Sequence, residues 1–380
     1  MFRFHRQSKT SLLLIMLLFV IECLQPALAQ PDKAHKPLTV AYIGISWDGY
    51  WGHVKNFMHQ VADDLDIRLL FKSADNGKLA YKALEDVLSQ EEQVDYLVFT
   101  LHPHSMSRMF ALAESKGIPY FTFNRDLTDK QKQQLGKPRE KYPLWLGHIY
   151  ADDYIAGRQL AELMVKATND NLGKVSMIGI GGTYTVGGGA ERNSGLIDLS
   201  TEKPGFVLNR VIHTKWRVAD AERAVAQLMT VYPDTNVIWS ASESLTTGTI
   251  SALRQLDITP GKEVLVGGID WSPEGLESIQ RGELHVSLGG SFMQGGWSLI
   301  LLHDYHQGID FNNDIGTMIS LPLHPITAAN IERYVTIFDE ARFNFFNFKT
   351  YSKYYSSNLE RYLLSPTILA DDSNKIGSPQ

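Results

Sequence analysis

The chain has 380 residues, of which 36 are lysine or arginine and 42 are aspartate or glutamate, giving a formal net charge of −6. This balance lacks the basic excess of a nucleic-acid-binding protein, so nucleic acid is not expected as a partner. The single cysteine, Cys23, excludes a disulfide scaffold and a cysteine-based zinc site.

The first 29 residues have the pattern of a secretory signal peptide. Basic residues precede an apolar run, Ser11–Ile21, and small residues flank a cleavage site after Ala29. The run is shorter than the roughly 20 apolar residues that span a membrane. We therefore expect residues 1–29 to be removed and the mature protein to be exported to the periplasm.

Cys23 leaves a second interpretation open, in which the chain is a lipoprotein. Glu22 precedes it, however, where a lipid-modified cysteine is preceded by a small residue. Cleavage after Ala29 is favoured and leaves a mature chain without cysteine.

From residue 38 onwards, short apolar strands alternate with amphipathic helices, a pattern typical of βα units around a parallel sheet. In the first half we expect strands at Leu38–Ile45, Ile67–Lys72, Asp95–Thr100, Ile118–Phe123 and Leu144–Ile149. Helices are expected at Tyr50–Leu65, Leu79–Leu88 and Ser105–Lys116. The stretch between Asp126 and Tyr142 is polar and lysine-rich, and no helix or strand is expected in it.

The same alternation restarts near Tyr150. Strands are expected at Lys174–Ile180, Phe206–His213, Asn236–Ala241, Glu263–Ile269 and Leu284–Leu288. Helices are expected at Asp152–Ala167, Ala219–Val231, Leu245–Gln255 and Pro273–Arg281. A helix at Gly295–Gln307, a strand at Thr317–Leu321 and a helical, aromatic C-terminus from Thr327 complete the chain.

The predicted fold is α/β, with two doubly wound parallel-sheet lobes joined by a three-segment hinge. The N-terminal lobe comprises residues 37–149 and 291–322, the C-terminal lobe residues 150–290 and 323–365, and residues 366–380 a flexible tail. The hinge crossings are expected near Asn124–Tyr150, Gly289–Ser291 and Leu321–Pro325.

Polar and aromatic residues gather just after the predicted strands, where open α/β sheets bind ligands. A polyol is bound by carboxylates, amides and guanidinium groups together with aromatic rings that cover its C–H faces. The predicted ligand-binding residues are Asp48, Tyr50, Trp51, Asn124, Arg125, Arg192, Trp216, Ser242, Glu243 and Asp270. Trp51 and Trp216 are expected to sandwich the ligand, although core packing would equally explain a tryptophan at such a position.

Several of these residues lie in short segments that together point to a known family. The segments are Asp48-Gly49-Tyr50-Trp51, Phe123-Asn124-Arg125, Ala190-Glu191-Arg192, Trp216, Ser240-Ala241-Ser242-Glu243 with Gly248, and Gly268-Ile269-Asp270 with Pro273-Glu274-Gly275. From about Leu38 to Leu323 the chain resembles the ribose- and autoinducer-binding branch of the type I periplasmic binding proteins.

The resemblance implies a protein that captures a small polar molecule, a sugar or polyol, by hinge closure and is not an enzyme. It implies a membrane partner, either an ATP-binding-cassette (ABC) importer or, as the alternative, a sensor kinase, cyclase or chemoreceptor. Asn124 replaces the family's aspartate, Ser242 its asparagine, and Gly290 lies near its hinge glutamine. Neither ribose nor a borate-bearing autoinducer, which needs an arginine near Gly290, is therefore expected.

Other sites were weighed against this interpretation. Glycines at 179–182 and 187–189 lack the spacing of a phosphate-binding motif, and His102 and His104 lack further metal ligands, so no cofactor or metal is expected. Two alternatives remain: a secreted carbohydrate-active enzyme that uses Glu243 and Asp270, and a structural subunit without a ligand. The aromatic segment from Phe338 to Tyr355 is expected mostly to pack, with partner docking as the alternative.

Overall fold

The computed structural model describes residues 38–45, 49–90, 93–102, 104–171, 174–184, 188–338 and 346–370. These residues belong to one compact unit. The expected signal peptide, residues 1–29, lies outside the described residues. No helix in the described part of the chain is both long and apolar enough to cross a membrane.

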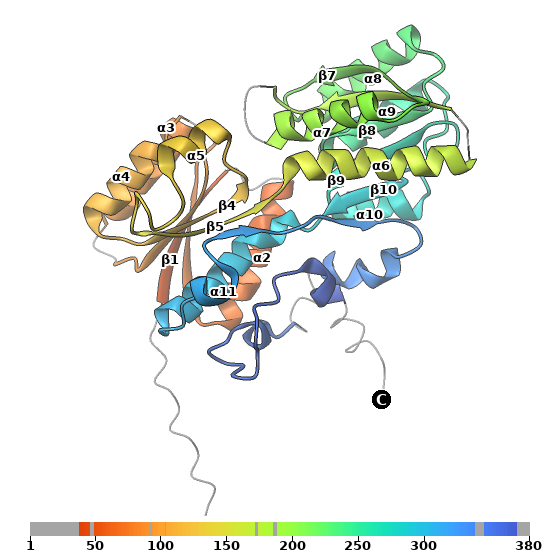
Figure 1. Ribbon diagram of the computed structural model, residues 1–380. Coiled ribbons are helices and arrows are strands. Elements are labelled where there is room, and N and C mark those ends of the chain that lie inside the picture. Colours follow the sequence, from red (N-terminus) through yellow and green to blue (C-terminus); the bar gives the residue numbers. More distant parts are fainter. Residues whose placement is uncertain are drawn as a thin grey trace, which may run out of the picture. The chain divides into compact units, whose positions relative to one another are not determined.

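The first sheet is parallel throughout, in the order β11-β5-β4-β3-β1-β2. Its strands are β1 (Leu38–Gly44), β2 (Ile67–Ser73), β3 (Tyr96–Thr100), β4 (Tyr120–Arg125), β5 (Trp145–Ala151) and β11 (Met318–Ser320). Helices α3 (Gly77–Leu88), α4 (Met106–Lys116) and α5 (Asp129–Leu135) cover one face, and α2 (Tyr50–Asp64) and α11 (Gln294–His306) cover the other (Figure 1). Successive side chains of β1 point to opposite faces of the sheet, and both faces are buried, because Tyr42 and Ile43 belong to different core clusters.

The second sheet has the order β12-β10-β9-β8-β6-β7, and only the edge pair β12 and β10 is antiparallel. Its strands are β6 (Val175–Gly181), β7 (Phe206–His213), β8 (Val237–Ser240), β9 (Leu265–Asp270), β10 (Val286–Gly289) and β12 (His324–Ile326). The helices around it are α6 (Asp153–Asn171), α7 (Gly188–Glu202), α8 (Val218–Val231), α9 (Glu243–Gln255) and α10 (Pro273–Gln280). Gly267 lies against α6, whereas its neighbour Gly268 lies against α9, so these helices cover opposite faces.

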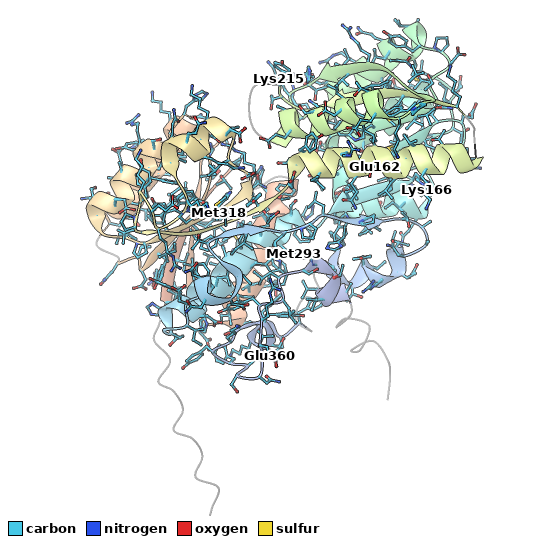
Figure 2. The ribbon with its side chains drawn as sticks, viewed as in Figure 1. Glu162, Lys166, Lys215, Met293, Met318 and Glu360 are labelled. Carbon is cyan, nitrogen blue, oxygen red and sulfur yellow. The ribbon has the colours of Figure 1, made fainter. Side chains whose placement is uncertain are left out.

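The chain passes between the two sheets three times. It leaves the first sheet after β5 and enters α6, returns from β10 into α11, and runs from β11 directly to β12. Met293, just before α11, and Met318, on β11, mark the later two passages in Figure 2. We call each sheet with its covering helices a lobe, the first around β1 and the second around β6.

The α/β class and the two doubly wound sheets are confirmed, but several local expectations were wrong. Helix α5 lies in the polar stretch between Asp126 and Tyr142, where no helix was expected, because Thr128 and Gln131 form a capping box that starts it. Helix α7, which begins at Gly188, was not among the expected helices. In the described residues between Thr327 and Ser365, where helix was expected, the structure has short 3₁₀ turns, at Ile331–Arg333, Val335–Phe338 and Phe348–Tyr351.

The C-terminal segment is fastened to α11 by a buried carboxylate. Asp304 accepts hydrogen bonds from the Lys353 backbone N–H at 2.6 Å and from the Tyr362 hydroxyl at 2.8 Å. Residues 366–370, expected in a flexible tail, are helical, and Leu369 and Ala370 are fully buried. Their apolar side chains are the physical reason for this difference, since burial outweighs the disorder typical of a chain end.

Candidate functional site

Three residues of the first lobe lie together beyond the carboxyl ends of its strands. The Asn124 Nδ2 donates to the Tyr50 hydroxyl at 3.0 Å, and that hydroxyl donates to the Ser291 Oγ at 3.1 Å. Asn124 has a φ of 101°, a left-handed conformation that asparagine tolerates better than most side chains. The predicted residues Tyr50 and Asn124 are therefore in direct contact, whereas Asp48 lies outside the described residues.

Arg125 ends β4 and turns its guanidinium back toward the loop after β3. Its Nε and Nη2 donate to the Leu101 carbonyl at 3.1 and 3.0 Å. Its Nη1 is buried and has no hydrogen-bond partner among the described residues. Burial lowers the pKa of Arg125, while the nearby carboxylates of Glu191, Asp153 and Asp126 oppose that shift. Arg125 thus retains one buried donor that could bind an acceptor.

In the second lobe Arg192 forms the centre of a buried polar group. Its Nε donates to Asp153 at 2.7 Å, and its Nη1 donates to the Ala241 carbonyl at 2.7 Å and to Asp270 at 3.4 Å. The side chains of Arg192 and Asp153 are only 12% and 4% exposed. Burial raises the pKa of Asp270 to about 6, although Arg192 lowers it in part. The predicted pair Arg192 and Asp270 is thus an ion pair within a satisfied network.

A cavity lies beside Asp153 of the Arg192 group. Its walls come from α5 and the loop before it, from the start of α6 and from α7: Asp126, Leu127, Thr128, Asp129, Lys132, Asp152, Asp153, Tyr154 and Glu191. Glu191 follows the beginning of α7, and burial together with Asp153 and Asp126 raises its pKa to about 7. The cavity is therefore polar and borders the Arg192 group.

Ser242 and Glu243 lie at the beginning of helix α9, close to the beginning of helix α10. The Ser242 Oγ accepts from the Leu245 N–H at 3.4 Å and caps α9. The Glu243 carboxyl contacts the Ser287 hydroxyl and lies against Gly275 in the first turn of α10. It is 6% exposed, and burial raises its pKa to about 8. Direct contact of these two residues with a ligand stays a prediction.

The three tryptophans at strand ends differ in their surroundings. Trp271 is fully buried and donates to the Ser287 carbonyl at 3.1 Å, so it packs in the core. Trp51 is partly buried and makes an edge contact with Tyr50. Trp216 is also partly buried and donates from Nε1 to the Thr183 Oγ1 at 2.9 Å. Trp51 and Trp216 keep exposed surface, and the sandwich they were expected to form stays a prediction.

The glycine-rich stretch around residue 182 accommodates Trp216. A Cβ added at Gly182 would lie 2.0 Å from the Trp216 ring, and one at Gly189 would lie 2.8 Å from it. These glycines let the backbone approach an aromatic ring. His102 and His104 belong to no group of potential metal ligands in the described part of the chain.

Sequence reasoning missed Asp153 and Ser291. Asp153 was visible only as part of an acidic pair with Asp152 at a helix end, where capping was the simpler interpretation. Ser291 follows Gly290 in the second passage and carries no motif. Both follow the carboxyl end of a strand, β5 and β10, so a search of every strand end would have found them.

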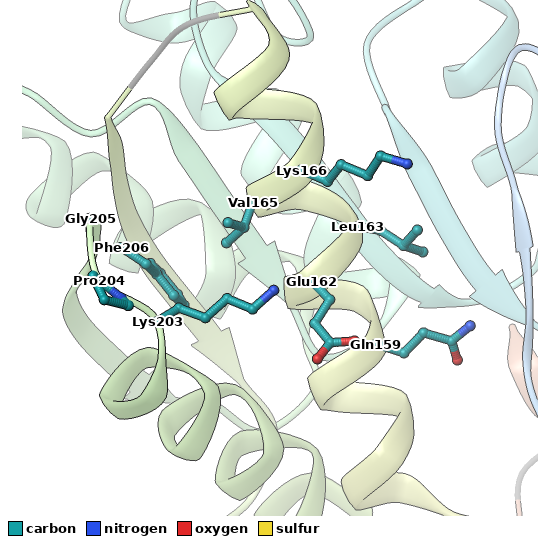
Figure 3. Close-up of a pocket in the computed structure, with 9 residues that line it drawn as sticks. All are labelled: Gln159, Glu162, Leu163, Val165, Lys166, Lys203, Pro204, Gly205 and Phe206. Carbon is teal, nitrogen blue, oxygen red and sulfur yellow. The ribbon is translucent and has the colours of Figure 1, made fainter.

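A second pocket lies on the second lobe between α6 and the start of β7 (Figure 3). Lys203 extends toward Glu162, whereas Lys166 points away from it. Phe206 is the first residue of β7, so this pocket lies at the amino end of that strand. It is on the opposite edge of the sheet from the Arg192 group and is a surface groove between charged side chains.

Comparison with known proteins decides the family. The periplasmic binding protein domain matches residues 40–309. The chain belongs to the periplasmic binding protein family. This confirms the resemblance to sugar-binding type I periplasmic proteins drawn from the sequence.

This periplasmic binding protein is 20% identical over 277 residues to the galactofuranose-binding protein YtfQ of Escherichia coli, covering 71% of this chain and 82% of that protein. It is 21% identical over 241 residues to the ribose import binding protein RbsB of Escherichia coli, covering 62% and 73%. A periplasmic sugar-binding protein from Pseudomonas fluorescens has the same fold, with a TM-score of 0.77, 24% identity and coverage of 87% and 99%.

Proposed function

We propose that this protein captures a neutral sugar or polyol between its two lobes and presents it to an ABC importer. The observation that carries the proposal is the convergence of donors and acceptors at the strand ends of both lobes. Arg125 and Asn124 come from the first lobe, and Arg192 with Asp270 come from the second. The names of the relatives, which bind ribose and galactofuranose, support a sugar.

The charges favour an uncharged ligand. Arg192 is balanced by Asp153 and Asp270, and Lys132 pairs with Asp126 at 2.7 Å. Each sugar hydroxyl both donates and accepts, so it matches carboxylates and guanidinium groups placed side by side. An acidic ligand would have to compete with these carboxylates for the arginines, which disfavours its binding.

We infer that the two lobes close around the ligand by motion at the three passages between the sheets. A ligand that contacts both lobes stabilises the closed arrangement by its differential affinity, as in hinge-closing binding proteins generally. Export by residues 1–29 would place the protein in the periplasm, and a membrane permease would recognise the closed form. A membrane sensor could recognise the same closed form in place of the permease. Measuring whether the sugar-bound protein binds to a reconstituted permease or to a reconstituted sensor would distinguish the two partners.

The first test is thermal unfolding of protein stripped of ligand by denaturation and refolding. The panel is D-ribose, D-allose, L-arabinose, D-galactose and myo-inositol. A sugar at about 100 times its dissociation constant adds about 2.7 kcal/mol to the stability, seen as a rise in the midpoint. Absence of any rise, and of any copurified sugar, would contradict the proposal.

Two arginine variants give the matched comparison. Arg125→Gln removes the free Nη1 donor and is expected to weaken sugar binding by about tenfold or more. Arg158→Gln removes the ion pairs with Glu162 and Glu202 on the surface of the second lobe and should leave the affinity unchanged. Incubation of the purified protein with a glycoside tests the enzymatic alternative, since a binding protein leaves the glycosidic bond intact.

A further inference from the structure

A chain of buried polar groups runs through the first sheet to the peptide of Arg125. The Trp145 Nε1 donates to the Thr122 Oγ1 at 2.9 Å, and that hydroxyl lies 2.9 Å from the His148 Nδ1. The His148 Nε2 lies 3.0 Å from the Arg125 carbonyl oxygen. Trp145, Thr122 and His148 are all fully buried, so they do not contact solvent or a ligand.

The partners fix the direction of every bond in this chain. An indole nitrogen only donates and a carbonyl oxygen only accepts, so the His148 Nε2 must carry a proton. The Thr122 hydroxyl accepts from Trp145 and is then free to donate to the His148 Nδ1. Burial lowers the pKa of His148 to about 3, which agrees with a neutral ring in this single tautomer.

The series of hydrogen bonds ends next to a strained backbone conformation. Asn124 has a φ of 101°, and a non-glycine residue in such a conformation persists only when its surroundings hold it. The next carbonyl, that of Arg125, is the group that His148 holds. From the same residue the guanidinium extends to the Leu101 carbonyl and leaves Nη1 without a partner among the described residues.

We propose that Trp145, Thr122 and His148 are positioning residues, which fix the Arg125 peptide and thereby aim its guanidinium at a hydroxyl of the bound sugar. This inference rests on the proposed function. A positioning role differs from a merely structural one, because removal of the Thr122 hydroxyl must then weaken sugar binding through a displacement of the Arg125 guanidinium.

The binding test uses calorimetry with the sugar of the five-member panel that raises the unfolding midpoint most. Thr122→Val removes the central hydroxyl with little change in shape and is expected to weaken binding about tenfold. Thr122→Ser keeps the hydroxyl and should restore the affinity to within about twofold. Thr168→Val is the matched control, because Thr168 is equally buried and bonds only to the Met164 carbonyl of its own helix.

A double-mutant cycle decides whether the effect passes through Arg125. In the Arg125→Gln background, Thr122→Val should change the dissociation constant less than twofold. An undiminished tenfold loss in that background would overturn the positioning role. So would an equal loss in the Thr168→Val control.

A second measurement needs no sugar and therefore separates failure of this inference from failure of the proposed function. Nitrogen-15 spectra of the histidine rings should show His148 as the Nε2–H tautomer, without titration between pH 5 and 8. Thr122→Val should shift the Arg125 Nε–Hε resonance, whereas Thr168→Val should leave it in place. A protonated or Nδ1–H ring, or an unmoved arginine resonance, would contradict the inference even if every panel sugar failed to bind.

Discussion

Glu243 is a carboxyl group whose surroundings penalise its charge. Its pKa is raised to about 8 by burial, while glutamate in an unfolded chain has a pKa of about 4.3. The folded state therefore binds more protons than the unfolded state between these values, and the free energy of unfolding falls as the pH rises through that window. The hydroxyl of Ser287 offsets only part of this cost.

Glu243→Gln should remove this fall, because an amide does not titrate. We expect the variant to match the wild type near pH 4.5 and to exceed its free energy of unfolding at pH 8.5 by on the order of 2 kcal/mol. Urea unfolding at the two pH values measures the difference. Glu277→Gln, at an exposed position of α10, is the control and should leave the pH-dependent fall in the free energy of unfolding as in the wild type. A Glu243→Gln effect that is independent of pH would contradict the assignment.

At the scale of elements, the contact between α6 and α7 forms the Arg192 group. A Cβ at Gly157 would lie 2.0 Å from the Arg192 carbonyl oxygen, and one at Gly195 would lie 2.1 Å from the Tyr154 carbonyl. The two helix backbones therefore touch. This close crossing brings Asp153, on α6, within 2.7 Å of Arg192, on α7.

Gly157→Ala should separate the two helices. Although alanine favours a helix, the clash with backbone atoms of α7 is expected to destabilise the protein by about 2 kcal/mol and to weaken sugar binding. Unfolding by urea and calorimetry with the panel sugar measure both effects. Ser194→Ala, an exposed position on α7, should change neither. A Gly157→Ala protein with unaltered affinity would show that helix spacing does not set the Arg192 geometry.

The same glycines explain why the sequence predicted some elements and not others. The strand Phe206–His213 was predicted to the residue, because its β-branched and apolar residues follow the turn residues Pro204 and Gly205. Helix α7 was missed because its glycines predict a loop when only local preferences are considered. Here they permit close helix packing and contact with Trp216, which are tertiary requirements.

For the site, the positions after strands could be found from the sequence, but the pairing of their side chains could not. Arg192 and Asp270 were both named, yet their direct contact, and the Asp153 carboxylate and Ala241 carbonyl that also hold the Arg192 guanidinium, depend on tertiary packing. His148 was no more than part of a predicted strand. Its role follows from the register in which it lies opposite Thr122.

For the whole molecule, Gly290 lies at the passage from β10 to α11. It has a φ of 106°, and a Cβ there would lie 2.5 Å from Pro366, in the helical turn that ends the described chain. Gly308, after α11, has a φ of 91° but has open space around it. Substitution by alanine therefore costs about 1–2 kcal/mol of backbone strain at either position. Only at Gly290 does the added Cβ also collide with another residue, Pro366.

Gly290→Ala is accordingly expected to lower the unfolding midpoint more than Gly308→Ala and, in addition, to impair closure. Small-angle scattering with and without the panel sugar measures closure as a decrease in the radius of gyration. The wild type and Gly308→Ala should show the same decrease, whereas Gly290→Ala should show a smaller one and a weaker affinity. If the two variants lose stability equally and close alike, the passage at Gly290 does not take part in the hinge motion, and the other two passages must carry it.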